Sequence, residues 1–356
     1  MTSVSMFQAL LRGLWLWGLA CCLSSAAAAA TPQARFTLLC YHEIDDRADA
    51  LIPGYAVKPQ QFAEQLAWLQ ESGYHFVSVD DILADKAGKR PLPPKALLLS
   101  FDDGYRSVYR NALPLLRKYG AHAVVGLVGS WLTGHDGKVN FDGREVARSE
   151  LMSWAELREL QRSGLVEIAS HSYALHQGIL ANPQGNLEPA AIARAYLPAQ
   201  QRYEDEATYA ARVREDLKHN SDLIRSQLGK APRIIVWPYG RYNQTSRQIA
   251  DSLGMKIGFT LDDGPNAAST PLWGLRRVLV EPTMTLAALN REIELRNYNV
   301  RDNGVPAKVM HVDLDYLYDP DPATTEDNLG RLLDRINRMG VNTIYLQAYA
   351  DPDGNG

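Results

Sequence analysis

Cysteine is scarce in this sequence, and neither sign of charge dominates it. The 356 residues include three cysteines, and two of them, Cys21 and Cys22, lie near the amino terminus. Cys40 would have no partner after removal of a leader, which argues against a fold held together by disulfides, and we expect it to be a small core residue. Lys and Arg (37) and Asp and Glu (41) nearly balance at a net charge of −4, and no basic stripe occurs, which argues against a nucleic-acid-binding protein.

The amino terminus lacks an apolar run long enough to span a membrane comfortably. Arg12 precedes a short apolar stretch at 14–20, and alanines follow at 26–30. This order is typical of a secretory signal, so we expect residues 1–30 to be a signal peptide and the protein to act in the periplasm. Residues 19–22 also resemble a bacterial lipidation box. Cleavage after the alanines and lipidation of Cys22, which would anchor the chain to the outer membrane, are both open.

Predicted strands and helices alternate over about 270 residues. This alternation predicts a parallel sheet, and the number of units favours an α/β fold with a distorted (β/α) barrel. A capping-box pattern at Ser153 and Glu156, for example, predicts a helix start. The strands are expected at 36–42, 76–79, 96–99, 122–128, 166–170, 234–237, 256–260 and 276–280.

The last fifty residues form a different unit. A strand at 308–314, a helix at 325–339 and a strand at 341–348 predict one βαβ unit, which is the start of a second (β/α) barrel. We therefore expect a first domain at 31–306 and the beginning of another at 307–356.

Two adjacent aspartates, Asp102 and Asp103, follow the apolar run 96–99 and precede Gly104. A short apolar run that ends in two carboxylates predicts a buried strand delivering acids into a loop. Gly104 allows a tight turn there. The alternative is a plain surface turn.

Two histidines favour the functional reading of this turn. His171 and His176 lie five residues apart, just beyond the expected strand 166–170. With one aspartate they make a two-histidine, one-carboxylate set, which suits a divalent transition metal ion and leaves positions open for water and substrate. The other aspartate would be free to take a proton from the attacking water.

These motifs resemble those of the polysaccharide deacetylases, the NodB-homology carbohydrate esterases, over about residues 36–280. The resemblance implies Asp102 as the general base and Asp103, His171 and His176 as ligands of Zn, Co or Ni. Residues 237–240 (Trp-Pro-Tyr-Gly) resemble a third family motif, which implies that the backbone N–H of Tyr239 helps to hold the oxyanion.

Two features of the family pattern are missing. Val236 and Trp237 stand where an arginine is expected before the proline of the third motif, and no late histidine motif follows Gly258 within the domain. In the family that arginine tunes the base. His42, at the end of the first strand, resembles the replacement acid of members with circularly permuted motifs, so we expect His42 to protonate the leaving amine.

The permuted motifs, the leader, a long insertion at 177–206 and the second unit together resemble members that act during biofilm exopolysaccharide export. This likeness implies N-deacetylation of poly-β-1,6-N-acetyl-D-glucosamine, an outer-membrane export porin as partner, a monomeric chain and a glycoside-hydrolase-like second unit. The insertion, next to His176, is expected to help form an extended cleft. The alternatives are another N-acetylated glycan, such as peptidoglycan or chitin, and a carbohydrate-binding export module with a vestigial site.

Overall fold

The computed structural model describes residues 35–47, 50–133, 137–141, 143–297, 308–314 and 317–347. The chain divides into two compact units, Met1–Tyr298 and Asn299–Gly356. The predicted signal peptide with Cys22, and the predicted boundary between residues 306 and 307, lie outside the described residues and stay predictions. Among the described helices, none combines the length and the apolar character needed to cross a bilayer.

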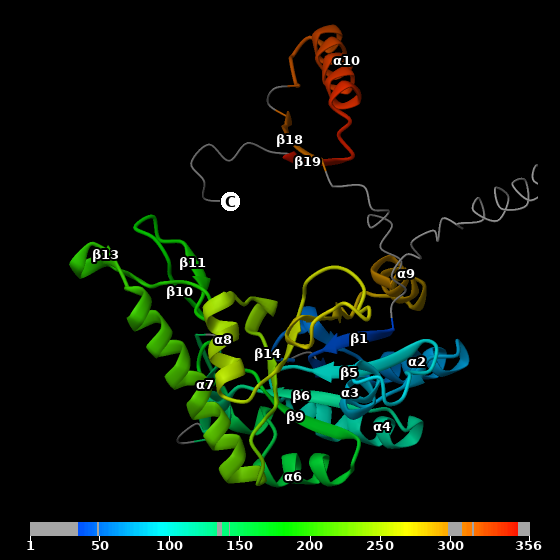
Figure 1. Cartoon of the computed structure of the whole chain (residues 1–356), viewed down its shortest axis with the longest axis vertical. Coiled ribbons are helices and arrows are strands. Elements are labelled where there is room, and N and C mark those ends of the chain that lie inside the picture. Colours follow the sequence, from blue (N-terminus) through cyan, green and yellow to red (C-terminus); the bar gives the residue numbers. More distant parts are fainter. Residues whose placement is uncertain are drawn as a thin grey trace, which may run out of the picture. The chain divides into compact units, whose positions relative to one another are not determined.

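A parallel sheet forms the centre of the first unit (Figure 1). Its strands are hydrogen-bonded in the order β16-β15-β14-β9-β6-β5-β1-β17, and β4 also pairs with β5. Every pairing is parallel. The strands are β1 (Phe36–Tyr41), β4 (His75–Phe76), β5 (Ala96–Phe101), β6 (Ala123–Leu127), β9 (Val166–Ser170), β14 (Ile234–Val236), β15 (Ile257–Thr260), β16 (Leu275–Arg276) and β17 (Val278–Leu279).

The two ends of this sheet belong to one stretch of chain. β16 pairs with β15 and β17 pairs with β1, and only Arg277 separates β16 from β17. The sequence predicted one continuous strand at 276–280, but the segment changes partners at Arg277. The sheet therefore nearly closes on itself, and the predicted distorted (β/α) barrel is confirmed.

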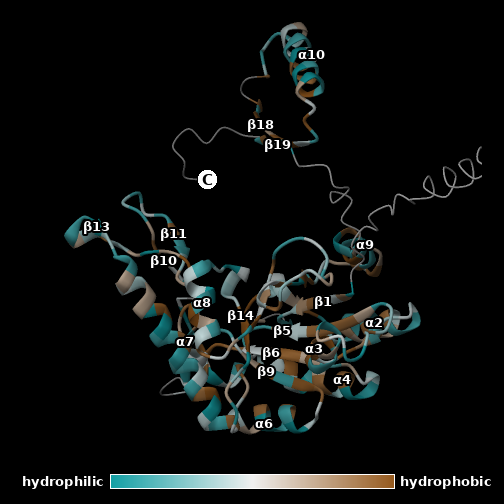
Figure 2. Ribbon diagram, viewed as in Figure 1, coloured by the Kyte–Doolittle hydropathy of each residue, from teal (hydrophilic) through white to brown (hydrophobic). Residues whose placement is uncertain are grey.

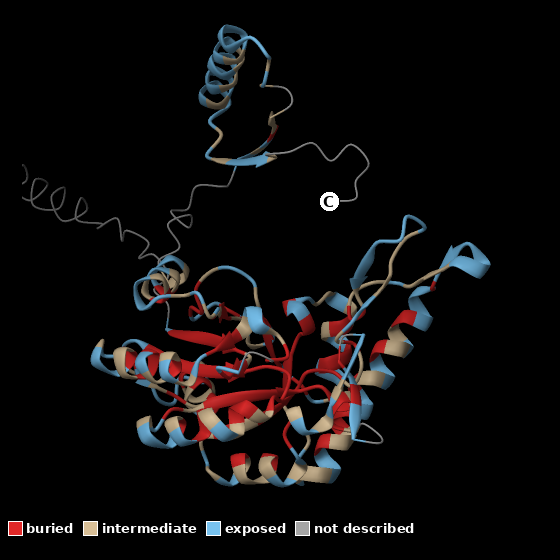
Figure 3. Cartoon of the chain, turned by 180° about the vertical axis from the view of Figure 1, so that it is seen from behind, coloured by how far each residue is buried: buried red, intermediate tan, exposed pale blue. Residues whose placement is uncertain are grey.

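The barrel strands are apolar and buried, whereas the surrounding helices are amphipathic (Figures 2 and 3). Every residue of β1 and β5 is buried, as expected for parallel strands that are covered on both faces. The longer helices carry both buried and exposed residues (Figure 3). The surrounding helices are α2 (Pro59–Glu71), α3 (Val79–Lys86), α4 (Leu113–Tyr119), α5 (Gly129–Leu132), α6 (Trp154–Arg162), α7 (Glu206–Leu228), α8 (Gln244–Ser252) and α9 (Leu286–Asn297).

Capping residues determine where two of these helices begin. The predicted capping box of Ser153 and Glu156 is present at the start of α6. The strand predicted at 76–79 is shorter than expected, because Ser78 caps α3 and exchanges hydrogen bonds with Asp81. The local cap thus ends the extended segment after Phe76.

The insertion at 177–206 forms two antiparallel hairpins before α7. β10 (Gly178–Leu180) pairs with β11 (Leu187–Pro189), and β12 (Tyr196–Leu197) pairs with β13 (Arg202–Tyr203). Both lie near the amino-terminal end of α7 (Figure 1). Arg212 of α7 donates hydrogen bonds to the carbonyls of Ala190 and Ala193 and pairs with Glu204. The insertion is therefore fastened to α7.

The second unit has the predicted βαβ order. β18 (Val309–Asp313) lies parallel to β19 (Thr343–Gln347), and α10 (Pro322–Met339) connects them. Asp321 caps α10, and Gly340 ends it in a left-handed conformation.

Candidate active site

A cavity of about 500 Å³ opens where the strands of the first unit end. Parallel strands bring their carboxyl ends to one rim of a barrel, which is where such folds place their sites. The predicted residues Asp102, Asp103, His171, His176, His42 and Tyr239 all line this cavity. The structure thus brings together residues that follow the carboxyl ends of β1, β5, β9 and β14. The insertion hairpins contribute none of the lining residues.

Three side chains converge as a candidate metal site: Asp103, His171 and His176. Oδ1 of Asp103 lies 3.4 Å from Nε2 of His171 and 3.6 Å from Nε2 of His176. This carboxylate oxygen is buried and has no hydrogen-bond partner among the described residues. A buried carboxylate oxygen facing two imidazole nitrogens fits a divalent ion, because buried polar atoms are otherwise satisfied.

Hydrogen bonds with neighbouring residues orient two of these ligands, Asp103 and His171. The Tyr105 hydroxyl donates to Oδ2 of Asp103 over 2.9 Å, which leaves Oδ1 facing the histidines. Nδ1 of His171 lies 2.7 Å from the Val236 carbonyl, so Nδ1 carries the proton and Nε2 is free to bind a metal. Burial would raise the pKa of Asp103, but His176 and His171 lower it well below its usual range.

Left-handed backbone turns aim the ligands. Asp103 has φ of +76° and Gly104 has φ of +82°. The consecutive turns redirect the chain at the end of β5, so that the side chains of Asp102 and Asp103 reach different partners. Ser172, directly after His171, has φ of +71°. Non-glycine residues in this conformation are strained and concentrate at functional sites.

Asp102 is paired with an arginine that the sequence did not reveal. Arg277 donates to Oδ1 and Oδ2 of Asp102 over 2.7 and 2.9 Å, and both side chains are buried. Burial would raise the pKa of Asp102, but Arg277 and nearby histidines lower it below its ordinary value. Arg277, between β16 and β17, is thus the counterpart of the arginine that is missing before Pro238. An arginine beside the apolar run 278–280 was the available sequence signal.

Cys40 is buried, as expected, and its Sγ lies 3.5 Å from Oδ2 of Asp102. His42 lies close to both residues, with a ring nitrogen within 4.8 Å of Sγ of Cys40 and of an Asp102 oxygen. Its ring stacks on Tyr55, at 4.9 Å between centroids. His42 therefore has the proximity that an acid working with Asp102 needs, and its catalytic role stays a prediction.

Tyr239 lies between β14 and α8 with φ of +56°. Its ring centroid is 4.5 Å from that of His176, and 40% of the residue is exposed. Tyr239 borders the cavity beside a candidate ligand, and the predicted role of its backbone N–H stays a prediction.

A buried carboxyl, Glu43, fastens the loop that carries Tyr55. Glu43 is 2% exposed and accepts a hydrogen bond from the backbone N–H of Ile52. Burial raises the pKa of Glu43 to about 7. The carboxyl is therefore protonated in the folded chain at a pH where it is ionised in the unfolded chain.

The Glu43→Gln variant is expected to become more stable relative to the unsubstituted chain as pH rises, as measured by the free energy of unfolding. With a folded pKa of about 7 against an ordinary 4.5, the original chain loses stability between these two values, by up to about 3 kcal/mol. Glutamine does not titrate. Urea unfolding of both metal-free proteins at pH 5 and pH 8 measures this difference. The control Glu64→Gln, on the exposed face of α2, should change the free energy of unfolding by under about 0.5 kcal/mol. An equal Glu43→Gln effect at both pH values would contradict the expectation.

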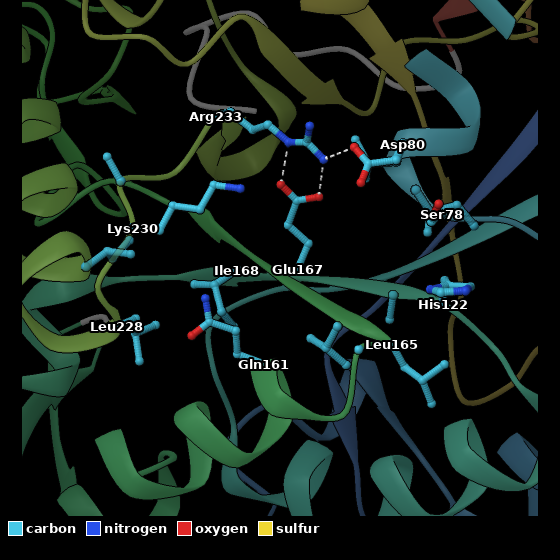
Figure 4. Close-up of a pocket in the computed structure, with 17 residues that line it drawn as sticks. Ser78, Asp80, His122, Gln161, Leu165, Glu167, Ile168, Leu228, Lys230 and Arg233 are labelled. Carbon is cyan, nitrogen blue, oxygen red and sulfur yellow. Dashed lines mark hydrogen bonds and ion pairs between the residues drawn. The ribbon is translucent and has the colours of Figure 1, made fainter. Parts of the chain in front are cut away.

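A smaller cavity of about 250 Å³ lies near the amino ends of β6 and β9 (Figure 4). Its central guanidinium, Arg233, donates to both oxygens of Glu167 and to Asp80. Arg233 thus pairs with both Glu167 and Asp80. Residues at the amino ends of barrel strands typically contribute to stability. The predicted catalytic and metal-binding residues line the other cavity, at the carboxyl ends of the strands.

Known proteins share this architecture. The Polysaccharide deacetylase family model matches residues 89–258, and the Hypothetical glycosyl hydrolase family 13 model matches residues 311–356. The chain is 38% identical over 326 residues to the Escherichia coli (strain K12) poly-beta-1,6-N-acetyl-D-glucosamine N-deacetylase. That match covers 91% of this chain but only 48% of the E. coli protein, so the chain spans about half the length of this relative.

Two solved structures are matched over almost their whole length. The BpsB deacetylase domain from Bordetella bronchiseptica is 44% identical, with a TM-score of 0.63, and the match covers 69% of this chain and 95% of that domain. The de-N-acetylase from Aggregatibacter actinomycetemcomitans is 34% identical, with a TM-score of 0.67, and the match covers 72% and 98%. The sequence motifs, the barrel and these relatives agree: the chain belongs to the polysaccharide deacetylase family.

Proposed function

We propose that this chain is a metal-dependent N-deacetylase of poly-β-1,6-N-acetyl-D-glucosamine. The observation that carries the proposal is the position of the Asp103, His171 and His176 ligand atoms beside the Asp102–Arg277 pair in one cavity. The names of the relatives from E. coli and Staphylococcus aureus support this polymer as the substrate. The proposal includes release of acetate from the exopolysaccharide during export for biofilm formation.

The chain's own residues divide the reaction between them. Asp103, His171 and His176 would hold a divalent ion, which would supply Lewis-acid polarisation of the amide carbonyl and lower the pKa of water. Asp102, kept ionised by Arg277, accepts the proton of the attacking water. His42 donates a proton to the amide nitrogen as the C–N bond breaks, giving the amine and acetate. The backbone N–H of Tyr239 is proposed to hold the oxygen that becomes negatively charged.

Chelation should abolish acetate release from the polymer, and Zn²⁺, Co²⁺ or Ni²⁺ should restore it. His176→Ala should bind less than one equivalent of metal and lose activity, because two ligands rarely hold a divalent ion. Metal content by elemental analysis and acetate release measure both effects. His75→Ala removes an exposed histidine outside the cavity and should keep metal and activity. Full activity in metal-free protein would contradict the proposal.

Comparison of substrates tests the polymer assignment. We expect faster acetate release from a β-1,6-linked N-acetylglucosamine pentamer than from the monomer, because binding energy from remote sugars can stabilise the transition state. Faster turnover of chitin or peptidoglycan fragments would move the assignment to those glycans.

We propose the periplasm as the site of action, on the strength of the signal-like segment at 1–30. An outer-membrane export porin is the proposed partner, and the monomer is the proposed state. Lipidation of Cys22 would add an outer-membrane anchor. Mass spectrometry of the mature amino terminus distinguishes a lipidated Cys22 from cleavage after the alanine run.

A further inference from the structure

The inner face of α7 holds the loop that carries both candidate metal-binding histidines. Asp216 accepts a hydrogen bond from the backbone N–H of Tyr173 on Oδ1, over 2.8 Å, and another from Ala174 on Oδ2, over 2.7 Å. Asn220, one turn later, is fully buried and donates to the Leu127 carbonyl and to Oγ of Ser170. Residues four apart lie on the same side of a helix. Asn220 therefore binds the chain just before His171, and Asp216 binds it just before His176.

This loop needs an external support. Ser172 lies inside it with φ of +71°, a conformation that costs on the order of 1 kcal/mol or more and persists only where the surroundings impose it. The two N–H groups that follow Ser172 donate to Asp216. The carboxylate therefore satisfies the backbone at the point where the turn leaves regular structure.

The two histidines differ in how directly they are held. His171 is oriented by its own hydrogen bond to the Val236 carbonyl. Nδ1 of His176, in contrast, is buried without a hydrogen-bond partner elsewhere in the described chain. The His176 ring contacts Trp131, at 5.0 Å between centroids, and Tyr239. Its position thus depends on ring packing and on the course of the backbone that Asp216 holds.

We propose that Asp216 is a positioning residue for the metal site: its carboxylate fixes residues 172–175 so that His176 faces Asp103 together with His171. The inference rests on the proposed metal-dependent function. Asp216 is not among the residues that line the cavity, and it accepts hydrogen bonds from the backbone N–H groups of Tyr173 and Ala174, so it acts through the loop. Outer partners of ligands typically contribute 10- to 100-fold in metal affinity.

Asp216→Asn tests this role because it replaces one acceptor oxygen with an NH₂ group that faces a backbone N–H. We expect the dissociation constant for Zn²⁺, measured by competition with a chromophoric chelator, to rise about 10- to 100-fold. The visible absorption spectrum of the Co²⁺-loaded variant should also change, since the ligand geometry changes. Asp222→Asn, on an exposed turn of the same helix, has the same change of charge and should match the original chain in both readouts.

The binding measurements distinguish failure of the proposed metal-dependent function from failure of the role assigned to Asp216. If the original chain binds neither Zn²⁺ nor Co²⁺, the proposed metal-dependent function fails, and this inference fails with it. If the original chain binds both ions and Asp216→Asn binds them with equal affinity and an identical spectrum, the inference alone is overturned.

Should Asp216→Asn not fold, hydrogen exchange in the original chain replaces it. The amides of Tyr173 and Ala174 are expected to exchange slowly in the metal-free protein, because the carboxylate holds them before any ion binds. Exchange at the rate of free peptide would overturn the inference.

Discussion

Asp102→Asn is expected to lower the rate of deacetylation by about 10²–10⁴-fold, the usual contribution of a general base. Asparagine keeps the shape of the side chain but cannot take a proton from water. The metal site should survive, because Asp102 is not one of the three converging ligands. Steady-state acetate release and metal content, measured on the same preparation, give the two readouts.

His42→Ala should cause a loss of similar size, also with metal retained, because the amine then leaves without its proton donor. Asp103→Asn provides the contrast, since it removes a charged ligand and should lower metal content along with activity. Near-normal turnover in His42→Ala would place the acid elsewhere. Loss of metal in Asp102→Asn would show that Asp102 helps to hold the ion.

Arg277→Met is expected to destabilise the first unit by about 3–5 kcal/mol, because it leaves the buried carboxylate of Asp102 without its partner. The expected loss of activity follows for the same reason: a buried, unpaired Asp102 takes up a proton more readily and is a poorer base at neutral pH. Urea unfolding of the metal-free protein measures the change.

The double variant Asp102→Asn with Arg277→Met tests whether the unpaired charge causes the loss. The double variant has no buried charge without a partner at this position, so it should be more stable than Arg277→Met although it is inactive. Arg276→Met is the neighbouring control, since that guanidinium donates to the Pro265 carbonyl, and it should cost less. A single Arg277→Met effect under about 1 kcal/mol would show that the pair contributes little to stability.

Local sequence patterns predicted the barrel and four residues at its rim (Asp102, Asp103, His171 and His176), whereas His42 and Tyr239 were predicted from the family resemblance. The apolar runs before Asp102 and before His171 predicted the two strands that end at these residues. The carboxyl ends of parallel strands meet at one rim of a barrel, so the two sites were expected to lie close together. The capping box at Ser153 needed no tertiary information either.

The partners of these residues depend on contacts far apart in the chain. Arg277 meets Asp102 across 175 positions, and no periodicity announces such a pairing. Asp216 likewise stands on an exposed-looking charged helix, and its role depends on how α7 packs against residues 173 and 174. The sequence predicted one continuous strand at 276–280, because the change of pairing strand at Arg277 does not alter the apolar pattern of the segment.

The split between β16 and β17 also bears on how the chain is made. The first strand, β1, finds its neighbour β17 only after residue 279 exists, some 240 positions later. A nascent chain that ends before residue 275 has two open sheet edges, on β1 and β15, and open edges invite pairing with other molecules. During synthesis, the unfinished barrel is thus the state that most needs protection by chaperones, and the arrival of residues 275–279 covers the open sides of β1 and β15 together.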